Sequence, residues 1–215
     1  MNLKQHFHSI FFLVLLCGFP AGQLYAQKLS AGNLIDSLHQ KSDQYFTEGR
    51  MDSALVVTDL LYALYAERGD AQQMVKTKAN RAEILRSVVS LDLAYEDLMT
   101  VKSLAELLDS SFIKSLYYNR LAAIQFERQN YEEAKIAAMV SRKYQASGKE
   151  EWLNYSNLNI LGAIYRDEKK WDLAIEVLKK IFKMAKGVDN NSEMYLALKN
   201  LGFTYFRMGD YRKAV

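Results

Sequence analysis

Polar and aromatic side chains recur along the chain at forty-residue intervals, and their types suit binding more than catalysis. Asn119 and Asn159 stand one interval apart, and an amide side chain can both donate to and accept from a peptide backbone. A second series alternates phenylalanine, which offers apolar area, with arginine, which binds carboxylates in a forked geometry. The first series comprises His39, Ala79, Asn119, Asn159 and Lys199, and the second comprises Phe46, Arg86, Phe126, Arg166 and Phe206.

Catalytic or metal-binding chemistry has few side chains to draw on. Two of the three histidines lie close to the N-terminus, which leaves His39, and the only cysteine is Cys17. One histidine without a nearby cysteine argues against a typical zinc site. The Gly148-Lys149 pair is not followed by Ser or Thr, so it is interpreted as a turn and not as a phosphate-binding loop. We expect no catalytic residue, no metal and no cofactor, and therefore no enzyme.

Charge and hydrophobicity narrow the class of partner. The chain of 215 residues carries 28 basic and 25 acidic side chains, for a formal net charge of +3. This near balance gives no reason to expect nucleic acid or an acidic membrane surface as the main partner. No second hydrophobic segment comes after the N-terminal one, so we expect no membrane span in the mature chain.

The N-terminus has the pattern of a secretory signal peptide. An apolar run at 10–17 is followed by small residues that end near Ala26. The run is far shorter than the roughly 20 residues of a spanning helix, and Pro20 ends it. We predict a signal peptide over residues 1–26 and an exported, periplasmic mature protein. A lipoprotein modified at Cys17 is the disfavoured alternative, because this cysteine follows two leucines and not a small residue.

A forty-residue repeat must position the recurring side chains. Five alanines share this spacing, and a small residue lies twelve positions before each of them. The pattern predicts two helices per unit, whose backbones approach closely at the small residues. Proline is absent after Pro20, which also favours helices. The alanines are Ala54, Ala94, Ala134, Ala174 and Ala214, and the small residues are Ser42, Ala82, Ala122, Gly162 and Gly202.

The segments LGFTYFRMGDYRKA (201–214) and LGAIYRDEKKWDLA (161–174) resemble the tetratricopeptide repeat, with its Leu-Gly pair, following Tyr, and later aromatic and Ala. The unit is longer than the usual one of about 34 residues. The chain is also similar to the N-terminal regions of exported Bacteroidota proteins of this family. The resemblance implies an all-α fold, a right-handed α-solenoid of antiparallel helix pairs whose last repeat is truncated. The expected domain spans 27–215, with repeats at about 33–70, 71–110, 111–149 and 150–190 and an incomplete one at 191–215.

Proteins of this family bind extended peptides or partner helices along a concave face that the first helices of successive units line. The resemblance therefore implies that the recurring side chains form a groove for a protein or peptide partner. The alternative is that they are ordinary surface residues that satisfy one another. The carboxylate clamp of chaperone-binding members is not reproduced in this sequence. The predicted groove residues are Arg86, Asn119, Phe126, Asn159, Arg166, Lys199 and Phe206.

The last repeat is expected to leave an open end. A helix at about 191–208 would present Leu198, Leu201 and Tyr205 to a second helix that has only begun when the sequence stops. Leaving these side chains exposed forgoes roughly 1.5 to 3 kcal/mol each. We predict that the chain is a fragment of a longer protein and that its open end is a candidate surface for self-association.

Two functions are consistent with these patterns. The first is an exported, non-catalytic scaffold that binds a protein or peptide through its groove. The alternative is the periplasmic sensor segment of a longer signalling protein that carries a histidine kinase or a helix-turn-helix regulator. Neither function gives these residues a nucleic-acid site, because no basic recognition helix is present. The two functions differ only in the kind of segment expected beyond Val215.

Overall fold

The computed structural model describes residues 21–88, 90–145 and 150–214. Helix α2 (Ala21–Thr47) opens this part of the chain and runs across the predicted cleavage point after Ala26. The rest of the predicted signal peptide, Cys17 included, lies outside the described residues. None of the helices that the structure describes has both the length and the apolar character that crossing a bilayer requires.

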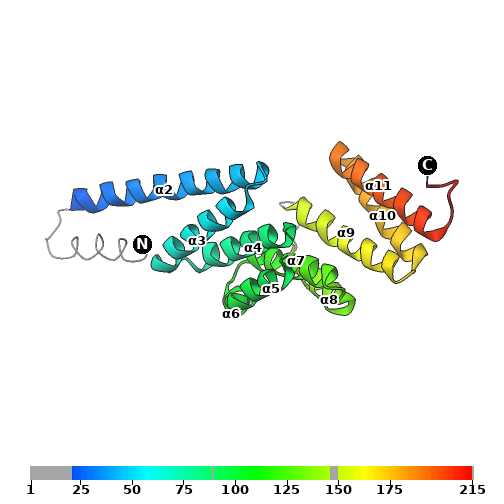
Figure 1. The fold of residues 1–215 in the computed structure, drawn as a ribbon, viewed down its shortest axis with the longest axis horizontal. Helices are drawn as coiled ribbons and strands as arrows, with labels where there is room; N and C mark the ends of the chain where they lie inside the picture. The colour runs from blue at the N-terminus through cyan, green and yellow to red at the C-terminus, as the bar shows by residue number, and fades with distance from the viewer. Residues whose placement is uncertain (1–20, 89, 146–149, 215) are drawn as a thin grey trace.

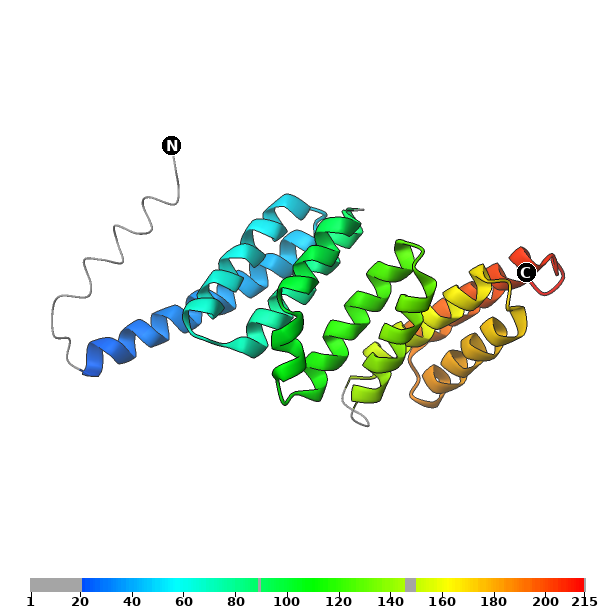
Figure 2. The same ribbon diagram turned by 90° about the horizontal axis from the view of Figure 1, so that it is seen from below.

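The described residues form ten α-helices and no strand, which confirms the predicted all-α fold. Helices that follow one another in sequence pack together as pairs, and the pairs succeed one another along an elongated array from α2 to α11 (Figure 1, Figure 2). The helices after α2 are α3 (Met51–Glu67), α4 (Ala71–Ser87), α5 (Leu91–Thr100), α6 (Lys102–Leu107), α7 (Ser111–Glu127), α8 (Tyr131–Tyr144), α9 (Glu151–Asp167), α10 (Trp171–Gly187) and α11 (Asn191–Met208).

Polar side chains start the first helices of three repeats. Asp70, Ser110 and Asn190 each accept a hydrogen bond from the backbone N–H three residues later, at 3.1, 3.4 and 3.1 Å. Each bond satisfies one of the N–H groups that the first turn of a helix leaves without a carbonyl partner. Asp70, Ser110 and Asn190 are therefore the N-caps of α4, α7 and α11.

Four turns between the paired helices share a left-handed residue, at positions that differ by multiples of forty. Gly49, Gln129, Lys169 and Gly209 have φ angles of 74°, 64°, 59° and 89°. In each turn the N–H of the next residue bonds back to a carbonyl of the preceding helix, as Lys170 does to Tyr165 at 2.7 Å. This geometry closes the C-terminal end of a helix and reverses the chain within a few residues.

The second helix of the second repeat differs from the expected single helix, because it breaks at Val101 between α5 and α6. The Thr100 hydroxyl donates to the Asp97 carbonyl at 2.6 Å, which an unbroken helix would offer to the N–H of Val101. That N–H bonds instead to Leu98 at 3.2 Å. Val101 itself is only 1% exposed, so the break does not remove its side chain from the core.

The periodic small residues lie where the helices of a pair meet. Gly162 approaches α10 so closely that an added Cβ would lie 3.3 Å from Leu178 Cδ2. Bulky apolar side chains fill the space around these contacts in four buried clusters. The alanines Ala54, Ala94, Ala134 and Ala174 and the small residues Ala82 and Ala122 are all fully buried.

The C-terminal repeat is open only in part. Helix α11 has the predicted bounds, and Leu198 is 53% exposed as expected. The expected exposure of Leu201 is wrong, because this side chain is only 9% exposed and joins the cluster around Leu178 and Ile181 on α10. Tyr205 is half-buried in the same cluster. The preceding repeat therefore covers one side of α11.

Candidate functional site

A groove of about 500 Å³ lies over the first helices of successive repeats. Helices α4, α7, α9 and α11 line it, and each packs against the next in this order. Small side chains, Ala123 and Ala163, lie among its lining together with Ile160 and Leu196. Four of the seven predicted residues line this groove: Arg86, Phe126, Asn159 and Arg166.

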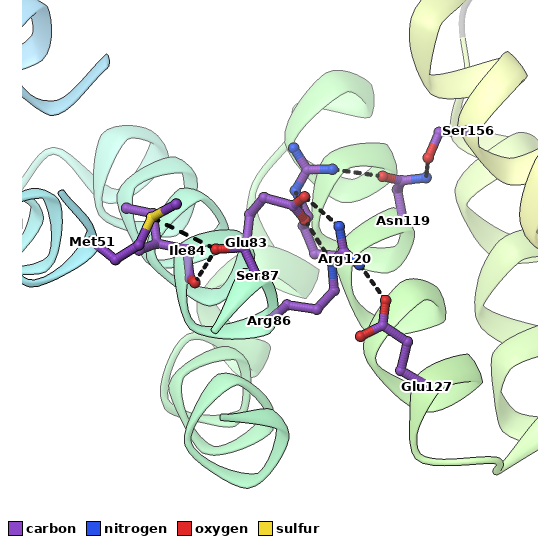
Figure 3. Close-up of polar contacts among 9 residues, drawn as sticks. All are labelled: Met51, Glu83, Ile84, Arg86, Ser87, Asn119, Arg120, Glu127 and Ser156. Carbon is purple, nitrogen blue, oxygen red and sulfur yellow. Dashed lines mark hydrogen bonds and ion pairs between the residues drawn. The ribbon is translucent and has the colours of Figure 1, made fainter. Parts of the chain in front are cut away.

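Arg86 already has carboxylate partners within the groove (Figure 3). Its Nε and Nη2 donate to Glu83 at 3.1 and 2.6 Å, and its Nη1 donates to Glu127 on the next repeat. The hydrogen bonds to Glu83 raise the pKa of Arg86 above its ordinary value. Burial acts to raise the pKa of Glu83, but the hydrogen bonds from Arg86 and the charges of Arg120 and Arg86 outweigh it and lower this pKa. Arg86 therefore holds two repeats together.

Arg120 is a groove residue that sequence reasoning missed. Its Nη1 donates to Asn119 Oδ1 at 3.1 Å, its Nε lies 3.7 Å from Glu83 Oε2, and its guanidinium stands 5.4 Å from the centre of the Trp152 ring. Burial lowers the pKa of Arg120 because Glu83 only partly offsets the loss of solvation. Arg120 and Glu83 also line a second hollow of about 190 Å³, so they stand where the two hollows meet.

The structure corrects the expected position of Asn119, because this side chain is fully buried and does not face an accessible groove. Its amide donates to Asn157 at 2.8 Å and to Ser156 at 3.0 Å, across the interface between α7 and α9. Ala79, which lies forty residues before Asn119 in the same series, is also fully buried. Asn119 therefore stabilises the interface between repeats.

Asn159 is partly buried and Arg166 mostly buried on the groove side of α9, the Arg166 side chain being 12% exposed. Asn159 accepts a hydrogen bond from Asn200 of α11 at 3.0 Å, and its own amide nitrogen makes no hydrogen bond to another described residue. Arg166 lies 4.8 Å from the centre of the Phe203 ring, and its Nε is 3.6 Å from Asp167. Stacking on an aromatic face fixes a guanidinium while leaving its N–H edge available.

The structure separates Lys199 and Phe206 from the other predicted residues. Both line another hollow, of about 620 Å³, at the C-terminal end of the array. Phe203 and Tyr211 line the same hollow, and the Phe206 and Tyr211 rings meet edge to face with centroids 5.6 Å apart. The seven predicted residues therefore occupy three places: the groove, the buried interface and the terminal hollow.

Outside these hollows, His39 has a structural partner. Its Nε2 lies 2.7 Å from the Tyr65 hydroxyl, a hydrogen bond that joins α2 to α3. Burial, assisted by the charge of Lys76, lowers the pKa of His39.

Within the described ranges, no three His, Cys, Asp or Glu side chains gather in a way that would hold a metal ion. Comparison of the chain with protein-family models and with curated proteins gives no match.

Proposed function

We propose that the chain is an exported, non-catalytic scaffold that binds a segment of a protein partner in the groove over α4, α7, α9 and α11. We further propose that the helix pairs form a right-handed solenoid of the tetratricopeptide type. The observation that carries the proposal is the groove itself, a hollow of about 500 Å³ that continues across four successive first helices. Its volume lies within the range of about 300 to 1,000 Å³ that is typical of ligand sites.

The lining of the groove suits a polypeptide ligand. Ala123 and Ala163 leave room for a backbone to approach the helices closely. The amide nitrogen of Asn159 is free to donate to a peptide carbonyl, and Phe126 and Leu196 offer apolar area. Alternating apolar and polar contacts of this kind are what a polypeptide segment can satisfy along its length.

The test is selection from a library of random-sequence peptides on the immobilised protein. We expect peptides to be enriched on the wild-type chain and to bind at least about tenfold more weakly to Ala163→Arg, which fills the groove. A second variant, Asn159→Ala with Arg166→Ala, removes polar groups without adding bulk. The matched control is Ile136→Arg, because Ile136 on α8 is 62% exposed and does not line the groove.

Circular dichroism and the thermal midpoint show whether each variant keeps its fold. Equal binding by the two groove variants and by Ile136→Arg would show that peptides do not use the groove. A failure to enrich any peptide on the wild-type chain would contradict peptide binding as a whole.

A further inference from the structure

Glu193 is a carboxylate in the groove whose role the fold does not explain. It stands in the first turn of α11, and its backbone N–H donates to the Asn190 side chain at 3.1 Å. In a complete capping box the Glu side chain would return the bond to the N–H of the capping residue. The Asn190 N–H bonds instead to the Ala185 carbonyl at 2.9 Å. The Glu193 side chain is thus not used in capping its own helix.

The Glu193 carboxylate also lacks the partners that the other groove carboxylates have. Glu83 and Glu127, the other two carboxylates in the lining, both pair with Arg86. Glu193 has no ion pair among the described residues, and its Oε2 is buried without a hydrogen bond there. Burial alone raises the pKa of Glu193. No described side chain therefore offsets the charge of this carboxylate, and a cationic group of a ligand in the groove would do so.

The side chains around Glu193 would accommodate a long basic residue. Trp152 on α9 and Leu196 on α11 line the same groove and are 45% and 37% exposed. Lysine and arginine bury an aliphatic stem against apolar surface while the charged end reaches an acceptor. The combination of accessible apolar surface and an unpaired carboxylate is complementary to such a side chain.

We infer that Glu193 receives a lysine or arginine side chain of the partner segment bound in the groove. This inference rests on the proposed function, because it assigns one position of the ligand that the groove would take. The charge-assisted bond to Glu193 is expected to strengthen binding of such a segment by about tenfold or more.

The experiment compares peptides selected by the wild-type chain, by Glu193→Gln and by Glu133→Gln. Gln keeps the size of the side chain and removes its charge, and Glu133 is an exposed residue on α8 outside the groove. We expect a lysine or arginine to recur at one peptide position on the wild-type chain and on Glu133→Gln but not on Glu193→Gln. A synthetic peptide from the wild-type pool is then measured with its basic residue intact and replaced by glutamine.

The replacement is expected to weaken binding to the wild-type chain by about tenfold and to leave binding to Glu193→Gln nearly unchanged. Equal losses on both proteins would overturn the inference. Selected peptides without a recurring basic position would also overturn it while leaving peptide binding intact. If no peptide were enriched on any of the three proteins, the proposed function would fail as well.

Discussion

Asn119 donates its amide to Asn157 Oδ1 at 2.8 Å in a space between α7 and α9 where both side chains are fully buried. Asn157 in turn donates to the Ser141 hydroxyl at 2.8 Å, and Ser141 donates to the Ser115 carbonyl at 2.7 Å. These bonds cross three helices, α7, α8 and α9, and satisfy polar groups that burial would otherwise penalise.

Replacing one side chain of this hydrogen-bond network should leave its neighbours without a partner. Asn157→Leu removes the acceptor of Asn119 and the donor to Ser141, so we expect the free energy of unfolding to fall by about 1 to 3 kcal/mol. Urea denaturation measures the change. Asn159→Leu is the control, because Asn159 is only partly buried and makes one bond, and its loss should be smaller. An equal loss of unfolding free energy in the two variants would contradict the stabilising role assigned to the buried hydrogen-bond network.

Arg86 should make stability depend on pH through Glu83. The pKa of Glu83 is lowered in the folded protein, so its contribution is present above the unfolded value of about 4.5 and is lost as pH falls through the folded pKa. Arg86→Met removes the hydrogen bonds and one of the two positive charges that lower this pKa, and leaves Arg120 in place. We therefore expect the variant to be less stable than the wild type at pH 7 and the difference to shrink below about pH 4.5.

Urea denaturation at a series of pH values measures this difference. Lys143→Met is a suitable control, because Lys143 is exposed on α8 and forms no ion pair with another described residue. A constant difference between wild type and Arg86→Met across the series would show that Glu83 does not titrate as the structure implies.

Gly162 is expected to respond to substitution differently from Gly187. Alanine favours a helix over glycine by about 1 kcal/mol. An added Cβ at Gly187 meets nothing within 4 Å, whereas at Gly162 it would lie 3.3 Å from Leu178 Cδ2. Gly187→Ala should therefore raise the free energy of unfolding, and Gly162→Ala should raise it less or lower it. An equal gain in urea denaturation would show that α9 and α10 are not in close contact at Gly162.

Lys169 carries a conformational cost in its turn, where its φ is 59°. A non-glycine residue in this region costs roughly 1 to 2 kcal/mol, while glycine loses about 0.4 to 1 kcal/mol through the greater freedom of the unfolded chain. Lys169→Gly should therefore raise the thermal midpoint slightly. Lys180→Gly is the control and should lower the midpoint, because Lys180 is exposed in the interior of α10, where glycine is less favourable than other residues by up to about 1 kcal/mol. A lower midpoint for Lys169→Gly would contradict the expectation.

The sequence predicted the helices and their close contacts because both follow from the regular spacing of small and apolar residues. Ala54, Ala94 and Ala134 are fully buried as the spacing requires, and α11 has the predicted bounds. The break at Val101 was not predicted, because the Thr100 hydroxyl bond that accompanies it is no distinctive signal: Thr58 makes the same kind of bond within the unbroken α3. The spacing of hydrophobic residues does not predict local hydrogen bonds of this kind.

The candidate site was predicted less well, because contacts between repeats depend on several residues at once. Asn119 and Asn159 share a register, yet Asn119 is buried because Asn157 lies opposite it with a matching acceptor. Arg120 was missed because nothing in its own spacing distinguishes it. Glu193 had a usable signal, since Asn190 three residues earlier marks the start of a helix and directs attention to this position.

The buried chain of polar groups also bears on a hazard of repeated sequences, in which a helix pairs with the wrong copy during folding. The positions equivalent to Ser141 in other repeats are apolar and buried: Leu61, Val101 and Ile181. A helix shifted by one repeat would place Asn157, which contacts Ser141 in the native pairing, against one of these side chains without a hydrogen-bond partner. The helices in the middle of the array therefore favour their own neighbours over the equivalent helices of other repeats, because only the native pairing satisfies these buried polar groups.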